Sequence, residues 1–551
     1  MLSEVRNRKQ QLASLDSVED VPVDTTEHAG KSATDSPHIS VTPGKRLDHR
    51  IHVAPLNTPL HLRLETLAII WHTILIPFFL CLFLLLLLLG VVVWACVVIP
   101  YLIWWYGVDL HTPTNGKAVY RVKNWTKNLK LWEYFVNYYP IRVHKSCDYE
   151  PTYTEISVSD SDLIDLDDEQ DLISEKQITS VDKLFKFLGL KKRINASDKR
   201  RGVMKKVTTG PRYIFGYHPH GVISMGAMGL FATNALRNEP WEPPKFLKRL
   251  FIDTLKHKRL LPGINNIFPL TLTTQFTIPF YRDYLLSLGL TLALAKNIKS
   301  LINNGDNSVC IVVGGARESL LNSMVSSHTM VGRGYKGPDP AEDEEKEDPD
   351  KKRQMKLVLR NRKGFVKLAI ELGNVSLVPT FAFGEVDIYK ITKPRKNSWG
   401  YKFQQWLKQN FQFTLPFFSA RGVFIYDFGF LPYRNPINIC MGRPIHIPAN
   451  TLAEWRKEHP KEAEELVKEE KEEKERDREE KEAHKGHVMR STSFSSLFKL
   501  KEPKPKRSLI KEKLPPELLD HYHGLYVKEL QRVYEENKDK YGYGDVELVI
   551  Q

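Results

Sequence analysis

One uncharged apolar run constrains this chain more than any other feature of its sequence. From Thr66 to Val108 no Asp, Glu, Lys or Arg interrupts the chain. These roughly 43 positions are about twice the ~20 residues that one helix needs to cross the hydrocarbon core of a membrane. The run therefore excludes a purely soluble protein and predicts a membrane segment at residues 66–108.

The form of this membrane segment follows from its flanks and its middle. Basic residues lie on both sides: Lys45, Arg46, Arg50 and Arg63 before it, and Lys117, Arg121, Lys123 and Lys127 after it. Because Lys and Arg concentrate in cytosolic flanks, we predict that both ends face the cytosol, which requires an even number of crossings. Two short helices turning near Gly90, or a re-entrant hairpin, satisfy this requirement. The alternative is one long tilted span with the body on the far side.

Composition limits the kinds of partner and of cysteine site that this chain can have. The net charge of +14 among 551 residues suits an anionic partner, such as nucleic acid, an anionic membrane face or an acidic cofactor like coenzyme A. The basic residues alternate with acidic ones instead of forming one stripe, which argues against nucleic acid. The five cysteines include no CxxC pair, which argues against a disulfide scaffold or a cysteine zinc site.

The rest of the chain divides by composition into a tail and a body. Residues 1–60 are rich in Ser, Thr, Asp, Lys and Pro and predict a disordered cytosolic tail. No apolar core lies within its first ~30 residues, so the tail is not a signal peptide. Residues 120–551 predict a cytosol-facing domain. Segments dense in Glu and Lys, near 338–354 and 456–512, predict solvated insertions in it, the second with helical potential.

Alternating patterns in the body predict an α/β core. RYIFGY (212–217) is a β-rich run, and VCIVVGG (309–315) is a continuous apolar run that ends in a glycine pair. A helical apolar face follows at Phe365, Leu368, Ala369 and Leu372, and then the buried-strand pattern VSLVPTFAF. Strand, turn, helix and strand in this order are typical of an α/β fold.

The first predicted strand leads directly into a turn with two histidines. This turn reads His218-Pro219-His220-Gly221. A neutral imidazole can take a proton from a hydroxyl near pH 7 and pass it to a leaving group. Pro219 fixes φ between the histidines, and Gly221 permits close backbone approach. By itself the tetrapeptide fits a structural turn equally well, and no nearby third ligand supports a zinc site.

Two carboxylates follow predicted buried strands and are candidates to orient an imidazole. Glu318 follows VCIVVGGAR, and Glu385 follows VSLVPTFAFG. Either carboxylate is equally well placed to cap the start of a helix. Backbone N–H groups at Gly314 and Gly315 can face a phosphate or an oxyanion. The sequence holds neither GxxxxGK[ST] nor GxGxxG, which argues against nucleotide hydrolysis and nicotinamide chemistry.

These features, in this order, resemble the diacylglycerol acyltransferase type 2 family, in fungal-like form with charged inserts. The family also includes monoacylglycerol and wax-ester acyltransferases. The resemblance covers most of Leu67 to about Ile550, apart from the charged inserts. Behind the membrane run it rests on Tyr138-Tyr139-Pro140, FGYHPHGVISMGA, PFYRDYLLSLGL, VVGGARESL, LRNRKGFVKLAIELGNVSLVPTFAFGE, PYRNPI with GRPIHIP, and HYHGLYVKEL.

The resemblance assigns roles to residues of these blocks. It makes His220 the catalytic base with His218 beside it, and Glu318 the carboxylate that holds the imidazole. The related glycerolipid acyltransferases carry an Asp five residues after the His, and this chain has none there. The second signature block, implied to form or support the site, contains Arg362, Gly364, Phe365 and Glu385. The sequence departs from the family at Tyr139, where Phe is usual, and at Ala295-Lys296, where relatives have Ser-Arg.

The implied activity is esterification of the free hydroxyl of diacylglycerol with an acyl group from acyl-CoA. The fold implied is a glycerolipid-acyltransferase-like α/β core anchored by an N-terminal membrane hairpin, in the endoplasmic reticulum membrane and on lipid droplets. No metal or further cofactor is expected, and the resemblance is compatible with a homo-oligomer. Arg362 and Lys363 are candidates to bind the phosphates of coenzyme A. The alternatives are another acceptor, such as monoacylglycerol, a long-chain alcohol or a sterol, and a non-enzymatic membrane scaffold.

Overall fold

The computed structural model describes the hairpin and most of the body. The ranges are 57–158, 203–208, 210–254, 257–303, 307–319, 321–322, 325, 353–391, 398–399, 402, 406, 418–424, 429–466, 468 and 514–551. Nearly all of the predicted tail therefore lies outside the described residues. So do most of the insert near 338–354 and the larger part of the insert near 456–512. The described beginning of the second insert, after helix α14 (Thr451–Glu458), is helical.

The uncharged run forms two helical arms joined near Gly90. The first arm is α2 (Leu60–Leu88), and the second spans Val91–Thr114 through α3 (Val91–Val93), η1 (Trp94–Val98), α4 (Ile99–Trp104) and η2 (Trp105–Asp109). Gly90 has φ +88°, a left-handed conformation that suits glycine. Both arms are long and apolar enough to cross a membrane. The predicted pair of helices turning near Gly90 is confirmed, whereas the number of crossings and the orientation stay predictions.

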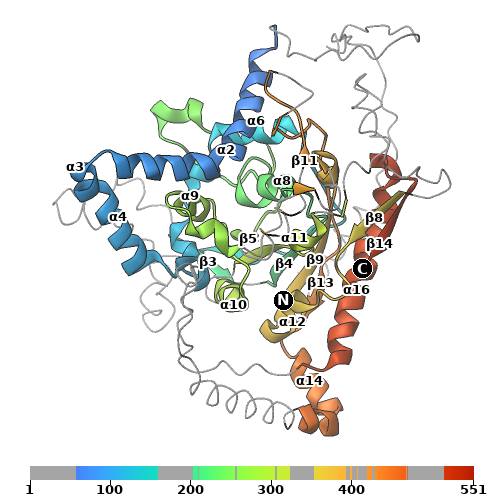
Figure 1. Ribbon diagram of the computed structural model, residues 1–551. Coiled ribbons are helices and arrows are strands. Elements are labelled where there is room, and N and C mark those ends of the chain that lie inside the picture. The colour runs from blue at the N-terminus through green and yellow to red at the C-terminus, as the bar shows by residue number, and fades with distance from the viewer. Residues whose placement is uncertain are drawn as a thin grey trace, which may run out of the picture. The chain divides into compact units, whose positions relative to one another are not determined.

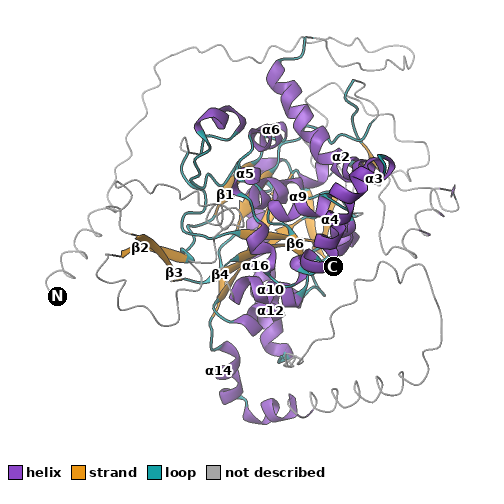
Figure 2. Cartoon of the chain, turned by 90° about the vertical axis from the view of Figure 1, so that its left-hand side faces the viewer, coloured by secondary structure: helices purple, strands orange, loops and turns teal. Residues whose placement is uncertain are grey.

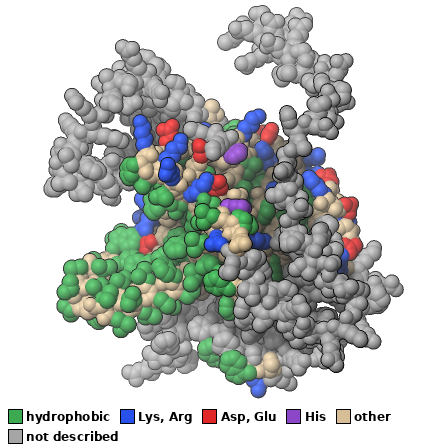
Figure 3. All heavy atoms as spheres, turned by 90° about the horizontal axis from the view of Figure 1, so that it is seen from above, with side chains coloured by type: hydrophobic (Ala, Val, Ile, Leu, Met, Phe, Trp, Pro, Cys, Tyr) green, Lys and Arg blue, Asp and Glu red, His purple; other side chains and the backbone are tan. Residues whose placement is uncertain are grey.

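Apolar side chains cover both arms. Only 11% of the most apolar window of each arm is buried inside the protein. Figure 3 shows these hydrophobic side chains gathered on the arm that projects at the left. Exposed apolar surface of this extent on two long helices is unfavourable in water and favourable in lipid.

The start of the hairpin is fixed to the body by one arginine. Arg434 forms an ion pair with Glu65 in the first turns of α2. Its guanidinium also donates to the carbonyl of Leu62, at 2.8 Å, and to Oγ1 of Thr66, at 3.0 Å. Helix α6 (Lys130–Tyr138) packs along α2. The first arm is therefore joined to the body immediately before the uncharged run begins.

A buried ion-pair cluster fixes the other end of the hairpin. Asp109, the first charged residue after the run, accepts from Arg282 Nη1 at 2.5 Å and from Arg121 Nη1 at 2.7 Å. Arg121 also pairs with Asp283 at 2.7 Å. Arg282 and Asp283 lie on α9 (Tyr281–Ser287), in the PFYRDYLLSLGL block. We call Asp109, Arg121, Arg282 and Asp283 the hairpin clamp.

The body is built on one mixed sheet. Within the described residues it has eight strands in the order β1-β12-β9-β4-β7-β5-β6, with β13 also paired to β9. Their bounds are β1 Arg142–Lys145, β4 Arg212–His218, β5 Ile267–Thr271, β6 Thr291–Leu292, β7 Ser308–Val312, β9 Val375–Phe383, β12 Asn438–Met441 and β13 Ile445–Ile447. β4 runs parallel to β7 and β9, and β12 runs antiparallel to β9. The mixed α/β architecture and the strands predicted from the runs at 212–217, 309–315 and 375–383 are confirmed, and the second run forms β7 up to Val312.

Helices cover both faces of this sheet, which explains the uninterrupted apolar runs of its central strands. On one face, β9 packs with α12 (Gly364–Leu372) and the C-terminal α16 (Pro516–Asn537), and β7 packs with α10 (Ala295–Asn303). These three helices lie together in Figures 1 and 2. On the other face, Tyr213, Phe215 and Tyr217 of β4 pack with α6 and η7 (Met228–Ala232). A strand buried on both faces needs apolar residues at every position.

Three two-stranded pairs lie outside this sheet. β2 (Tyr153–Val158) pairs with β3 (Val203–Thr208), and β10 (Lys390–Ile391) pairs with β11 (Phe418–Ser419). β8 (Arg353–Leu357) pairs in parallel with the last strand, β14 (Val546–Ile550). The β8–β14 pair brings the C-terminal end of the chain next to the segment that leads into α12.

Candidate active site

The two histidines of the predicted turn lie at the carboxyl end of β4. His218 is the last residue of the strand, and the His218–Pro219 peptide bond is cis. Gly221 has φ +60°, and a Cβ added there would lie 2.8 Å from the carbonyl oxygen of Glu385. Both its conformation and its surroundings therefore require glycine. The turn lies where open α/β sheets present reactive groups.

His218 points into the protein interior. Its side chain is fully buried, and its Nε2 lies 3.0 Å from Oη of Tyr526 on α16. Tyr526 Oη donates its proton to the carbonyl of Gly216, at 3.1 Å, so it accepts a hydrogen bond from His218 Nε2–H. Burial lowers the pKa of His218 to about 3. The ring is therefore neutral, and its geometry is that of a side chain that supports the turn.

His220 is the histidine with a free basic nitrogen. Its Nδ1 lies 2.8 Å from the carbonyl oxygen of Gly221. A carbonyl only accepts, so Nδ1 carries the proton and Nε2 carries the lone pair. No described side chain forms a hydrogen bond to Nε2. Burial lowers the pKa of His220 below its ordinary value of 6.5, which keeps the imidazole neutral near pH 7.

Glu318 contacts the backbone of this turn and not the imidazole. Its Oε1 accepts from the backbone N–H of His220, at 2.7 Å, and its Oε2 accepts from the N–H of Val358, at 2.8 Å. The predicted contact between this carboxylate and the imidazole is therefore wrong. The reason is geometric, because the four-residue helix α11 (Gly315–Glu318) brings the carboxylate under the main chain of the turn, close to Gly314.

The same surroundings perturb the acidity of Glu318. Burial raises its pKa to about 7. The two N–H donors and the nearby positive charge of Arg362 act in the opposite direction, because each favours the ionised form. Glu318 therefore holds the segments around His220 and Val358 together, and its carboxyl group titrates near physiological pH.

Glu385 acts as a helix cap, one of the two alternatives that the sequence left open. Its carboxylate accepts from Tyr217 Oη at 2.5 Å and from the N–H groups of Met225 and Gly226 at 2.6 and 3.0 Å. These two residues begin the short helix α8 (Met225–Ala227) that follows the histidine turn. The carboxylate is fully buried, which raises its pKa to about 7. Glu385 thus fixes the exit of the turn, as Glu318 fixes its centre.

The glycine pair after β7 has two distinct environments. A Cβ added to Gly314 would lie 2.1 Å from Oε2 of Glu318, so the close approach of that carboxylate requires glycine. Gly315 has φ +61°, and a Cβ added there would meet no atom within 4 Å. The backbone at Gly315 therefore borders open space next to the histidine turn.

The second signature block surrounds α12. Arg362 is exposed, close enough to Glu318 to influence its charge, and Lys363 forms an ion pair with Asp520 on α16. Gly364 begins α12, and the buried Phe365 packs edge-on against Tyr526, with ring centroids 4.8 Å apart. Of the two cations predicted to bind phosphates, Lys363 already has an acidic partner.

Sequence reasoning did not find the role of Tyr526. Its hydroxyl links His218 to Gly216, and a Cβ added to Gly216 would lie only 1.9 Å from that hydroxyl. Tyr526 lies in the HYHGLYVKEL block near the C-terminal end, far from the histidine turn in sequence. The only sequence signal for Tyr526 was its place in the HYHGLYVKEL block. A tyrosine on the inner face of an amphipathic helix does not indicate which side chain it contacts.

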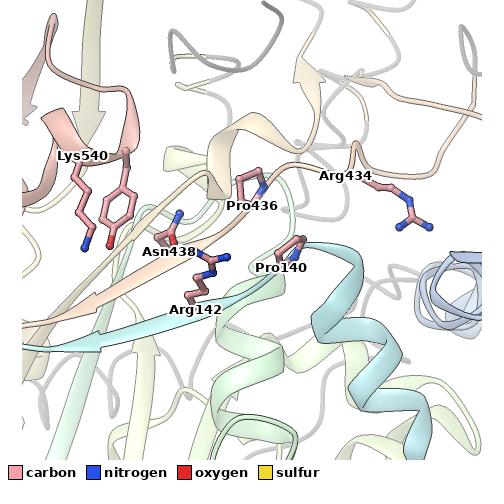
Figure 4. A pocket seen from close by; sticks show the side chains of 7 residues that line it. Pro140, Arg142, Arg434, Pro436, Asn438 and Lys540 are labelled. Carbon is pink, nitrogen blue, oxygen red and sulfur yellow. The ribbon is translucent and has the colours of Figure 1, made fainter. Parts of the chain in front are cut away.

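Two further observations bear on ligands. Among the described residues, no group of three or more His, Cys, Asp and Glu side chains is placed to hold a metal ion. A pocket of about 470 Å³ opens near β1 and β12, where basic residues are prominent (Figure 4). Its lining consists of Pro140, Arg142, Arg434, Pro436, Asn438, Lys540 and Tyr541.

Comparisons with known proteins agree on one family. A family model described as diacylglycerol acyltransferase matches residues 86–157, 204–337 and 344–481. Diacylglycerol O-acyltransferase 1 of Eremothecium gossypii is 34% identical, covering 92% of this chain and 82% of the relative. The protein of that name from Saccharomyces cerevisiae is 34% identical, over 90% and 88%. 2-Acylglycerol O-acyltransferase 1 of Bos taurus is 30% identical, over 72% and 87%. No solved structure matches.

Proposed function

This chain belongs to the diacylglycerol acyltransferase family, and we propose that it transfers a fatty acyl group from acyl-CoA to diacylglycerol, forming triacylglycerol. The observation that carries this proposal is the 34% identity, over nine-tenths of the chain, to relatives named diacylglycerol O-acyltransferase. The site adds a chemical reason. Its one histidine with a free Nε2 lies on a turn that two buried carboxylates hold in place.

In the proposed reaction His220 is the general base. Its Nε2 takes the proton of the free hydroxyl of diacylglycerol as the hydroxyl oxygen attacks the thioester carbonyl. The new O–C ester bond forms, the C–S bond breaks, and the imidazolium returns the proton to the thiolate of coenzyme A. Acyl-CoA is the co-substrate, and this step uses neither a metal nor a further cofactor.

The other predicted residues serve the reaction by position. Glu318 accepts from the backbone N–H of His220, and Glu385 accepts from the N–H groups of Met225 and Gly226, which follow the turn. The open backbone at Gly315 is a place where N–H groups can receive the oxyanion that develops on the thioester carbonyl. His218 supports the turn through Tyr526.

The hairpin supports a location of the active site at a membrane surface. Diacylglycerol and the acyl chain partition into lipid, whereas the coenzyme A moiety is anionic and stays in water, so the site belongs at a membrane surface. We propose that both ends of the chain face the cytosol at the endoplasmic reticulum membrane. A hairpin without a lumenal domain is also compatible with the single lipid leaflet of a lipid droplet.

Acceptor choice is the point on which the relatives differ. Some carry the name 2-acylglycerol O-acyltransferase, at 30% identity, so monoacylglycerol is the second candidate acceptor.

The choice of acceptor is tested with membranes from cells that lack their own neutral-lipid synthases and express this chain. Labelled oleoyl-CoA is supplied with diacylglycerol, monoacylglycerol or a fatty alcohol. We expect labelled triacylglycerol as the main ester, and product from another acceptor alone would move the chain to a sister branch.

The pKa of His220 predicts the pH dependence of acyl transfer. A general base works when it is neutral, and burial lowers the pKa of His220. Activity is therefore retained as pH falls to 6.5, and the acid limb of kcat/KM for acyl-CoA lies below that value. The measurement is the pH profile of the parent and of Glu318→Gln, because burial raises the pKa of Glu318 to about 7. An acid limb near pH 7 that disappears in Glu318→Gln would instead assign the titration to the carboxyl group.

The contact between Tyr526 and His218 predicts a positioning role. Tyr526→Phe keeps the ring that packs on Phe365 but removes the hydroxyl that bonds His218 and Gly216. We expect kcat to fall about tenfold, since a buried polar contact of ~1–3 kcal/mol is lost next to the catalytic turn. Both substrate KM values should stay within about twofold. Tyr522→Phe, on the same helix, is the matched control, and equal kcat values in the two variants would refute this role.

A further inference from the structure

The basic pocket opens at the end of the sheet where β4 and β9 terminate and the histidine turn begins. β4 ends at His218, which is opposite Phe381 of β9. Asn438 is opposite Phe383 of the same strand, and Arg142 is opposite Asn438. Residues paired in register lie on the same face of a sheet, and Phe381 and Phe383 pack on α16. The pocket therefore lies on the α16 side of the sheet, with Asn438 two strand spacings from β4 and Arg142 three, or roughly 10 and 14 Å.

Three polar side chains line the pocket away from α2. Figure 4 shows Arg142 and Asn438 close to each other, Lys540 farther along the same pocket, and Arg434 pointing away from them. Arg434 is occupied by Glu65, Leu62 and Thr66 of α2. The two remaining cations are solvent-exposed, and among the described residues neither forms an ion pair with a carboxylate. No Asp or Glu is among the residues that line the pocket.

The electrostatic environment of a neighbouring group agrees with this positive charge. The pKa of His144 on β1 is lowered by burial and then by the positive charges of Lys540 and Arg142. Two uncompensated cations and one amide in a pocket of about 470 Å³ form a site for a phosphate-bearing ligand.

We propose that Arg142, Asn438 and Lys540 bind the phosphates at the nucleotide end of acyl-CoA. This inference rests on the proposed function. The nucleotide end of coenzyme A is separated from its sulfur by a long pantetheine arm. A phosphate site set back from the catalytic turn along the same edge matches that separation. Of the two cations beside α12 that were predicted to bind the phosphates, Lys363 is paired with Asp520 and Arg362 is exposed.

The test compares Arg142→Ala, Lys540→Ala and the double variant with the parent. Lys528→Ala, an exposed lysine on α16 outside the pocket, is the matched control. The first readouts are KM for oleoyl-CoA, KM for diacylglycerol and kcat in vesicles of zwitterionic lipid. The second is binding of adenosine 3′,5′-bisphosphate to the purified chain, measured by calorimetry. The third is binding of the purified chain to vesicles with and without phosphatidic acid.

We expect each single variant to raise KM for oleoyl-CoA about tenfold and to weaken binding of adenosine 3′,5′-bisphosphate equally, because each removes one charge-assisted contact. KM for diacylglycerol and kcat should stay within about twofold of the parent. Unchanged KM and unchanged nucleotide binding would overturn the proposal. Loss of binding to phosphatidic acid with KM for oleoyl-CoA unchanged would overturn it in favour of a lipid headgroup.

The nucleotide-binding readout separates this proposal from the proposed function. If the parent makes no triacylglycerol yet binds adenosine 3′,5′-bisphosphate through Arg142 and Lys540, the proposed reaction fails and the phosphate site stands. If the parent makes triacylglycerol and the variants match it in both readouts, the reaction stands and the phosphate site fails.

Discussion

His220→Ala should lower triacylglycerol formation by about a thousandfold, within the ~10²–10⁴-fold range of general acid–base catalysis. The variant loses the Nε2 lone pair that takes the hydroxyl proton. It keeps the backbone N–H that donates a hydrogen bond to Glu318, so the turn retains its main support. The measurement is initial rate per amount of membrane-bound protein, with oleoyl-CoA and diacylglycerol both saturating.

The control for this variant is His521→Ala, which removes an exposed histidine on α16. We expect that variant to retain the parent rate within about twofold, as exposed substitutions usually do. If His220→Ala also retained the parent rate at equal protein level, His220 would not be the base. Retained cellular function without any acyl transfer would favour the membrane scaffold, the non-enzymatic alternative.

Arg282→Ala should cause the largest loss of stability, about 3–5 kcal/mol, because it removes one partner of a buried ion pair. Arg282 is 1% exposed and donates to Oδ2 and to the backbone carbonyl of Asp109, at 2.5 and 2.8 Å. Its loss leaves the buried carboxylate with Arg121 as its remaining cation. The hairpin clamp then opens at the end of the second arm.

The measurement is the thermal unfolding midpoint of the chain purified in detergent. Arg282→Lys should have an intermediate effect, because lysine keeps the charge but loses the planar fork that reaches both oxygens. Arg360→Ala, an exposed arginine in the body, is the matched control and should change stability by less than about 0.5 kcal/mol. Equal midpoints for Arg282→Ala and Arg360→Ala would show that the clamp does not stabilise the protein.

The central strands and the hairpin could be predicted because their signals are local. β4, β7 and β9 are apolar at nearly every position, since helices cover both faces of the sheet. Gly90 marks the turn between two arms that are long and apolar enough to cross a membrane. The pairing of β1 with β12 could not be predicted, because these strands are short, distant in sequence and include polar residues.

The candidate site was predictable in its residues but not in all of its contacts. The position of His220 follows from a strand that runs directly into a Pro/Gly turn. Glu318 was correctly brought to the same turn, but the path of α11 decides that its carboxylate meets an N–H group and not the ring. Tyr526 reaches His218 only because α16 crosses the sheet, and no local pattern encodes that crossing.

Acyl transfer to diacylglycerol can be measured with the purified chain alone. The purified chain is placed in phospholipid vesicles that contain diacylglycerol, and released coenzyme A thiol and triacylglycerol are measured together after addition of oleoyl-CoA. We predict one triacylglycerol for each coenzyme A released, with both products lost in His220→Ala. Release of coenzyme A without triacylglycerol, or no release from the parent, would show that this chain does not transfer the acyl group to diacylglycerol.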